Sequence, residues 1–454
     1  MICTELNNTR KMMLKLTIPL FFELLLYILV NNVDQFMLSF LSKAAVSAVT
    51  NTGQLSWVMT LFFQVASTAS VVLISQYKGA GDNETEKAIY PLALTVNVIL
   101  GFITSIVCIF LIDPILNLLN IAPGLTYDYA KIYMQIVGGM FVFQAIENCF
   151  ASYLKSNALV KEALVISIIV NLLNVGGNAL ALFVFDYGVA GVAWASGISR
   201  TIGMIISIIV FVKKVGHIRF RNLKSAPVLS LLGKILRIGG PSIGENFSYD
   251  LSQLVLMSFI NPMGDSVVNA KSYVCLIIEF AYLASLASAE ALRIVEGRLI
   301  GAKRKDEASK EVFRTLWVCL IIVECITILL WLCSDYAVGI FPSADADVLR
   351  VAKILFTVEL FLELGRVTNI IMVRALQTAG DVFFPVIMSI IFTWFVSVGV
   401  GYLLAIPAGL GIKGIWIAMA SDEIVRGSIL AIRFALGKWR KINLIDKDQN
   451  AEVS

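Results

Sequence analysis

The chain has 454 residues, of which 58% are hydrophobic and only 15% are charged, and its mean hydropathy is +0.84. Charged residues make up about a quarter of a typical soluble domain, so this composition excludes a soluble globular protein. The net charge at pH 7 is only +4, so the positions of the basic residues are more informative than their sum.

Apolar stretches long enough to cross a hydrocarbon core of roughly 30 Å recur along the whole chain, and about twelve can be distinguished. In chain order they cover residues 14–40, 45–75, 88–112, 127–154, 160–184, 189–212, 236–260, 265–297, 312–334, 347–375, 382–406 and 412–436. The first is too long for a signal peptide and no small-residue cleavage site follows it, so we interpret it as a retained anchor. The pattern predicts an all-α, multi-pass integral membrane protein.

Basic residues gather before the first stretch, in a linker at about residues 213–234, and after the eighth and twelfth stretches. The alternate loops are acidic or nearly neutral, with residues such as Asp113, Asp186 and Asp335. Lys and Arg are enriched in cytoplasmic loops of membrane proteins. Both termini and the linker are therefore predicted to be cytoplasmic.

The two halves of the chain repeat each other, because Gly301-Ala302 follows Gly79-Ala80 at a distance of 222 positions. The same shift relates Pro19, Glu23, Tyr27 and Leu154 to Pro241, Glu245, Tyr249 and Leu376. An ordered set of such matches predicts a tandem duplication, with six-helix lobes at residues 1–222 and 223–454. Transporters built from repeats place their substrate path between the repeats.

Several kinds of site are not indicated. The seven cysteines form no C-x-x-C, and the single histidine, His217, lies in the basic linker, so the sequence predicts no zinc site and no intramembrane histidine chemistry. The glycine-bearing loops at residues 76–82 and 298–304 lack the phosphate-binding pattern, and we interpret them as helix C-termini closed by glycine. We expect no cofactor and no nucleotide, so transport would use an ion gradient or be passive.

The first span carries a polar face. Glu23, Tyr27, Asn31 and Asp34 lie on one side of a helix, although a charge at the bilayer centre costs about 2.5–3.5 kcal/mol on insertion scales. Such residues need a partner, a cavity or a function. Two structural interpretations stay open. Asp34 could lie at the level of the lipid headgroups, and Glu23 and Glu245 could support helix packing beside a proline kink.

Spans four and five add amides and one acid. Asn171, Asn174 and Asn178 share a face with Ser167, and span four contributes Gln144, Glu147 and Asn148. An oxygen-rich acidic pocket of this kind suits monovalent cations or protons. The competing interpretation is that the amides form interhelical hydrogen bonds that hold the helices together.

The second lobe keeps the repeated residues but has Leu256 where the first lobe has Asp34. Its candidate cavity residues are Glu245, Tyr249, Asp250, Gln253, Glu279, Glu363, Arg366 and Asn369. Span ten places Glu359, Glu363 and Arg366 on one face, which predicts an internal ion pair. Span eight also carries Lys271, Glu290, Arg293 and Glu296. Because acids outnumber bases in these spans, an organic cation is the expected cargo.

These motifs resemble the multidrug and toxic compound extrusion (MATE) family over all the predicted spans. Pro19 precedes Asp34, in the context Val33-Asp34-Gln35-Phe36-Met37, like the aspartate motif of the family's first helix. The loops around Gly79 and Gly301 form a second match. A third is the pair of openings Gly188-Val-Ala-Gly-Val-Ala-Trp-Ala and Gly411-Ile-Lys-Gly-Ile-Trp-Ile-Ala, with Arg374-Ala-Leu-Gln-Thr-Ala-Gly380-Asp381.

The resemblance implies two six-helix bundles around a central cavity and export of cationic or amphipathic compounds in exchange for H⁺ or Na⁺. Asp34 matches the family's cation-coupling aspartate, and Asn174, Asn178 and Ser196 match a pattern of Asn, Asp and Thr. Asn replaces Asp and Ser replaces Thr here, which leaves the coupling ion open, with Na⁺ possible at Asp34, Asn174 and Asn178. The resemblance also predicts that Glu245 replaces a helix-seven Glu, for which this chain has Tyr249.

Three rival functions or folds are weighed against an exporter. A flippase for lipid-linked saccharides carries anionic cargo, for which a cavity lined by Arg and Lys would be expected. An integral membrane enzyme is disfavoured by the lack of a nucleophile motif, and the major facilitator arrangement by a loop after span two that lacks the basic pattern. We expect a monomer in the plasma membrane that contacts the bilayer and small cations, with no nucleic acid partner.

Overall fold

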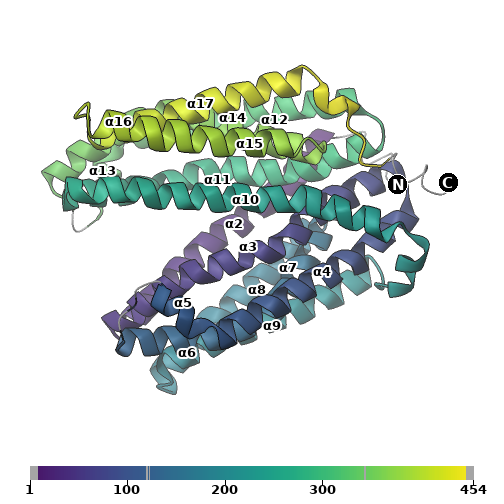
Figure 1. The fold of residues 1–454 in the computed structure, drawn as a ribbon, viewed down its shortest axis with the longest axis horizontal. Helices are drawn as coiled ribbons and strands as arrows, with labels where there is room; N and C mark the ends of the chain where they lie inside the picture. The colour runs from purple at the N-terminus through teal and green to yellow at the C-terminus, as the bar shows by residue number, and fades with distance from the viewer. Residues whose placement is uncertain (1–8, 119–120, 122, 342–343, 446–454) are drawn as a thin grey trace. The chain divides into compact units, whose positions relative to one another are not determined.

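The structure is a computed structural model that describes residues 9–118, 121, 123–341 and 344–445. Within this part, the side chains of residues 30–36, 39, 43, 118 and 225 are not described. The described residues form helices joined by short turns, and no strand occurs among them (Figure 1).

Each of the six spans predicted in the first half coincides with a helix or a run of helices. They are α2 (Thr9–Ser39), α3 (Lys43–Ala80), α4 (Asn83–Phe110), α6 (Leu125–Gly139) with α7 (Phe141–Ser156), α8 (Val160–Ala179) with the π-helical η2 (Leu180–Val184), and α9 (Gly188–Lys214). Two short elements, α5 (Ile112–Leu118) and η3 (Phe220–Ser225), lie between spans. Residues 213–234 thus include the end of α9 and the start of the next long helix.

The second half follows the same plan. Its spans are α10 (Val228–Ile260), α11 (Asp265–Gly301), α12 (Lys305–Leu332), α14 (Ala346–Thr378), α15 (Phe383–Phe392) continued by η5 (Thr393–Val400) and α16 (Gly401–Ala405), and α17 (Ile412–Ala435). The short elements are η4 (Asn261–Met263), α13 (Ser334–Gly339) and η6 (Lys438–Lys441). The fifth span of each half contains a π-helical segment, a feature that is frequent near functional sites.

Eight helical segments of the described chain are long and apolar enough, by length and composition, to cross a membrane. The predicted all-α membrane architecture is therefore confirmed. Helices α14 and α17 fall outside those eight because each carries several acids and arginines within the span. A helix of this composition crosses a membrane only when neighbouring helices cover its charges.

The chain divides into two compact units, and both boundaries lie within helices. One unit is Phe22–Ile243, and the other combines Met1–Phe21 with Gly244–Ser454. The boundaries in α2 and α10 each follow a repeated proline, Pro19 or Pro241, by two residues. The lobe division predicted at residue 222 stays a prediction, because each compact unit includes the first part of a helix from the other predicted lobe.

The repeated loops end helices in two different ways. α3 ends as predicted, because Gly81 adopts the left-handed conformation with a φ of 77° and its N–H bonds back to the last turn. In the second copy Gly301 is still helical, and the left-handed residue is Lys303, with a φ of 61°. Lys303 is equivalent to Gly81 in the 222-residue repeat. Both halves therefore have a left-handed residue at this turn, but only the first half has a glycine there.

Helices α14 and α17 approach each other unusually closely at two glycines. A Cβ atom at Gly365 would lie 2.4 Å from the backbone nitrogen of Ile424, and one at Gly427 would lie 3.0 Å from the carbonyl oxygen of Gly365. Small residues allow two membrane helices to bring their backbones together. This contact aligns the charged residues of the two helices.

Candidate ion and substrate sites

Three of the predicted coupling residues lie together in the unit formed by residues 22–243. Asn174 on α8 donates a hydrogen bond of 3.0 Å to the hydroxyl of Ser196 on α9. Asn178, one turn further along α8, donates to Oδ1 of Asn174 over 3.4 Å. All three side chains are buried, so this amide cluster joins α8 to α9 and presents oxygen atoms within the unit.

The predicted coupling carboxylate cannot be placed against this cluster. Asp34 belongs to α2, but its side chain lies outside the described residues, as does that of Asn31. The predicted Na⁺ site at Asp34, Asn174 and Asn178 therefore stays a prediction.

The other acids of this unit have separate surroundings. Glu23 on α2 forms an ion pair of 2.7 Å with Lys155 on α7, while Tyr27 remains half exposed. The carboxyl of Glu147 on α7 lies so close to Gly203 on α9 that a Cβ there would be 2.7 Å from Oε1. Among the described residues, no hydrogen bond or ion pair joins Glu23, Glu147 or Asn148 to the amide cluster.

The most extensive buried charge arrangement lies in the other unit and begins on α14. Arg366 pairs with Glu363, as its i, i+3 spacing predicted, and its Nη2 lies 3.8 Å from Oε2 of Glu359. Glu359 also accepts a hydrogen bond of 2.8 Å from the indole of Trp416 on α17. The guanidinium lies over the ring of Tyr282 on α11, at 5.2 Å from its centroid.

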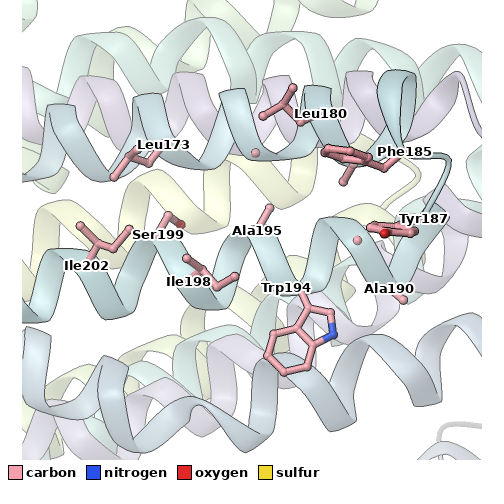
Figure 2. Close-up of a pocket in the computed structure, with 13 residues that line it drawn as sticks. Leu173, Leu180, Phe185, Tyr187, Ala190, Trp194, Ala195, Ile198, Ser199 and Ile202 are labelled. Atoms are coloured by element: carbon pink, nitrogen blue, oxygen red, sulfur yellow. The ribbon is translucent and has the colours of Figure 1, made fainter.

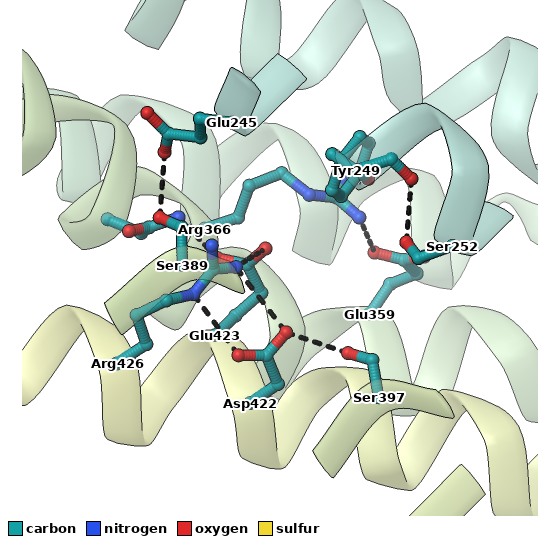
Figure 3. A network of polar contacts seen from close by, with 11 residues as sticks. Glu245, Tyr249, Ser252, Glu359, Arg366, Ser389, Ser397, Asp422, Glu423 and Arg426 are labelled. Carbon is teal, nitrogen blue, oxygen red and sulfur yellow. Dashed lines mark hydrogen bonds and ion pairs between the residues drawn. The ribbon is translucent and has the colours of Figure 1, made fainter. Parts of the chain in front are cut away.

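Helix α17 contributes a second set of charges that the sequence analysis missed. Arg426 contacts Asp422 at 3.1 Å and Glu423 at 2.6 Å, and Ser397 of η5 donates to Asp422 over 2.7 Å (Figure 3). Asn369 of α14 donates to Glu423 over 2.9 Å. The i, i+3 spacing of Glu423 and Arg426 equals that of Glu363 and Arg366, and this similarity was the available signal.

The two sets form one arrangement, here named the α14–α17 network, consisting of Glu359, Glu363, Arg366, Asn369, Asp422, Glu423 and Arg426. Its members are almost fully removed from water, apart from the partial exposure of Arg366. Four carboxyl groups face two guanidinium groups, so the network is negative by two charges when all its acids are ionised. A buried net negative charge requires protons or a cation for compensation.

Glu245, the repeated acid of α10, lies at the edge of this network (Figure 3). It accepts hydrogen bonds from Ser389 of α15 over 2.7 Å and from Gln377 of α14 over 3.3 Å. Tyr249 lies one turn further along α10, within electrostatic range of Arg366. Within the described residues, no hydrogen bond or ion pair links Gln253 or Glu279 to the network, and Asp250 is half-buried on α10.

A separate, apolar groove of about 600 Å³ runs between α8 and α9 in the unit formed by residues 22–243 (Figure 2). Its walls include Leu173, Leu180, Phe185, Trp194 and Ile198. These side chains are largely exposed within the unit, as expected for a surface that contacts lipid. The groove contains none of the predicted site residues, so it is distinct from the polar sites.

Comparison with known protein families finds a match in each half of the chain. The model of the MatE family matches residues 19–180 and 241–403, one match in each half. An uncharacterized transporter, YisQ of Bacillus subtilis, is 33% identical over 93% of this chain and 94% of its own length. The probable multidrug resistance protein NorM of Thermotoga maritima is 24% identical over 99% of this chain and 97% of its own.

Solved structures share the fold. A MOP superfamily transporter from Pyrococcus furiosus aligns with a TM-score of 0.87 at 19% identity, covering 96% of this chain and 97% of that one. The MATE transporter VcmN of Vibrio cholerae in its bent form gives a TM-score of 0.86 at 19% identity, over 96% and 98% of the two chains. With the family match in both halves and the YisQ similarity along nearly the whole chain, this protein belongs to the MATE family of multi-pass membrane transporters.

Proposed function

We propose that the chain is a secondary active exporter of cationic or amphipathic small molecules, driven by exchange for H⁺ or Na⁺. The observation that carries this proposal is the α14–α17 network, in which buried acids outnumber arginines by two to one. An apolar environment with surplus negative charge favours a cation over an anion. The same surplus disfavours a flippase for lipid-linked saccharides, whose cargo is anionic.

The coupling step follows from competition for that negative charge. A proton or Na⁺ that neutralises a buried carboxyl weakens the attraction of its surroundings for a cationic cargo. Ion and cargo then bind to different states of one conformational equilibrium, which is the condition for exchange. The amide cluster of Asn174, Asn178 and Ser196 supports a second position for a small cation, with Asp34 as its proposed carboxylate.

The chain's own residues supply binding and release in this proposal, and no covalent chemistry is required. We propose a monomer in the plasma membrane that acts as a transporter rather than an enzyme, with no cofactor beyond the coupling ion. Multidrug resistance proteins among its relatives, such as NorM of Thermotoga maritima, support a drug-like cargo.

Reconstituted vesicles provide the test. Purified protein in liposomes is supplied with a fluorescent organic cation, and a H⁺ or a Na⁺ gradient is imposed separately. We expect one gradient to drive movement of the dye and Asp34→Asn to reduce it by at least tenfold, because the carboxyl that takes the ion is lost. Vesicles with an anionic dye serve as the control for cargo charge. Movement under neither gradient would overturn the exchange mechanism.

A further inference from the structure

A row of three charged residues on α11 ends in two buried side chains, of which Arg293 uses part of its hydrogen-bonding capacity and Glu296 uses none among the described residues. Glu290, Arg293 and Glu296 follow one another at intervals of three residues, so each is a surface neighbour of the next along the helix. Nη1 of Arg293 donates a hydrogen bond of 3.2 Å to Oε2 of Glu290. Glu296 is completely buried, and neither of its oxygens has a hydrogen-bond partner among the described residues.

Arg293 is buried as well and uses only part of its guanidinium group. Its Nε and Nη2 have no acceptor within the part of the chain that the structure describes. An unused donor and an unused acceptor of opposite charge thus lie one helical turn apart. Rotation of the Arg293 side chain allows the guanidinium to contact Glu296 in place of Glu290, because both acids are three residues away.

The protonation state of Glu296 follows from its surroundings. An ionised carboxyl group without a donor or a cation is strongly unfavourable in a buried apolar environment. The conformation described therefore favours the protonated form of Glu296 over the ionised form. When that proton leaves, Arg293 is the neighbouring cation able to compensate the new charge, and it has to leave Glu290 to do so.

Glu290 keeps a cation when Arg293 moves away. Nε of Arg374 on α14 lies 3.8 Å from Oε1 of Glu290. Helix α14 packs against α11, and its Arg374 is a charged residue that acts on Glu290 and Arg293 of this row. Arg374 also donates to Gln377 over 3.2 Å, and Gln377 donates to Glu245 over 3.3 Å. A change at Glu296 is thereby connected to the repeated acid of α10.

We propose that Glu296 is a proton-binding site and that Arg293 is its switch, moving between Glu290 when Glu296 is protonated and Glu296 when the proton is released. The site lies outside the α14–α17 network and the amide cluster, so it adds a third position at which ion binding changes the protein. Only its use in transport rests on the proposed function. Proton binding itself is testable without any cargo.

Infrared difference spectroscopy against pH, on the purified full-length protein, reads out the proton directly. A protonated carboxyl group has a C=O stretching band separate from the backbone amide band. We expect the wild-type protein at neutral pH to show such a band that Glu296→Gln lacks. Gln has the shape of the neutral acid, so this variant is expected to fold as the wild type does.

Two further variants test the switch, and the expected shifts are opposite. Glu290→Gln releases Arg293 toward Glu296, so the Glu296 band should disappear at a lower pH than in the wild type. Arg293→Gln removes the cation, so the band should persist to a higher pH. A residue with a purely structural role would not give opposite shifts. Glu324→Gln is the matched control, because this acid of the α12 span has no arginine three or four residues away.

The outcomes separate this proposal from the transport function. Absence of a Glu296 band from the wild-type spectrum would overturn the proposal. The same titration of that band in the wild type, Glu290→Gln and Arg293→Gln would also overturn it. Opposite shifts in Glu290→Gln and Arg293→Gln, with no shift in the control, would establish it. Failure of dye movement in vesicles while the band behaves as expected would count against the exporter and leave the proton site intact.

Discussion

Asn369 on α14 donates a hydrogen bond of 2.9 Å to Oε2 of Glu423 on α17, while Oε1 of the same carboxyl is held by Arg426 at 2.6 Å. Both oxygens of Glu423 are therefore fixed, one by a neighbouring helix and one by its own. This arrangement joins the charged residues of α14 and α17 into a single network. A change in charge on one helix therefore alters the electrostatic energy of the charged residues on the other.

Truncation of the amide should weaken this connection. Asn369→Ala leaves a buried carboxyl oxygen without its donor, and we expect a loss of about 1–3 kcal/mol in stability. The measurement is the thermal unfolding midpoint in detergent micelles. Asn83→Ala, at an exposed position at the start of α4, is the control and should change stability by no more than about 0.5 kcal/mol. Equal midpoints for the two variants would contradict the connection.

Removal of an arginine from the network should have a pH-dependent effect. Arg426→Gln leaves Asp422 and Glu423 without their cation, and breaking a buried pair in this way costs about 3–5 kcal/mol. The destabilisation should be largest at neutral and alkaline pH and should shrink at acidic pH, because protonation removes the uncompensated negative charge. Thermal midpoints across pH provide the measurement.

The control for that experiment is an exposed pair. Arg350→Gln removes the partner of Asp347 at the start of α14, where both side chains are mostly in solvent. Exposed pairs contribute about 0–1 kcal/mol, so little change is expected at any pH. A loss in Arg426→Gln that does not vary with pH would argue that packing, rather than charge, is responsible.

The close approach of α14 and α17 should not tolerate a methyl group. Gly365→Ala places a Cβ 2.4 Å from the nitrogen of Ile424 and forces the two helices apart. We expect a destabilisation of about 1–3 kcal/mol, the usual cost of overpacking. Gly244→Ala is the matched control, since a Cβ at that helical glycine meets nothing within 4 Å. A stable, fully active Gly365→Ala protein would show that the helices separate easily.

If the ion pair of Glu23 and Lys155 has a structural role, the positions of its two charges should be reversible without loss of stability. Lys155→Glu places two like charges together, while Glu23→Lys combined with Lys155→Glu restores an attractive pair between α2 and α7. We expect the double variant to recover about 1 kcal/mol relative to Lys155→Glu, measured as a double-mutant cycle. Full dye efflux by the double variant supports a structural pair, and lost efflux with restored stability points to ion coupling.

A carboxyl in the amide cluster should change the ion dependence of transport. Asn178→Asp restores the acid that the family pattern has at this position, beside Asn174 and Ser196. We expect the Na⁺ dependence of dye efflux to increase about tenfold, because a second anionic oxygen ligand strengthens the binding of a hard cation. Asn148→Asp, on α7 and outside the cluster, is the control. Unchanged ion dependence in Asn178→Asp would place the coupling ion elsewhere.

Much of the architecture was predictable because it depends on local composition. The predicted spans coincide with the helices, and the loop after Gly79 ends α3 at a left-handed glycine as expected. The turn at Lys303 was not predictable in the same way, since its left-handed residue carries a side chain. The internal repeat implied a turn at this position, but a lysine at position 303 gave no indication of a left-handed conformation.

The contacts in the candidate sites also divide into those that local sequence predicts and those that it does not. The i, i+3 pairing of Glu363 with Arg366 and the clustering of Asn174 with Asn178 and Ser196 follow from helical geometry and a short connection between neighbouring helices. The partner of Glu23, Lys155, lies on a helix distant in sequence, and no periodicity indicates it. The role of Asp34 stays a prediction of the sequence.

By itself, the sequence determined a duplicated helical membrane protein with acids in its spans, because hydrophobic length and helical period are properties of each segment alone. Only the tertiary structure decided which charges compensate one another. Asp422, Glu423 and Arg426 belong to a network with α14 because Gly365 and Gly427 let the two backbones approach. Glu296 has no hydrogen-bond partner among the described residues, while Arg293 contacts Glu290. Those outcomes depend on contacts between helices and on the choice among side-chain rotamers, neither of which is encoded in the pattern of one segment.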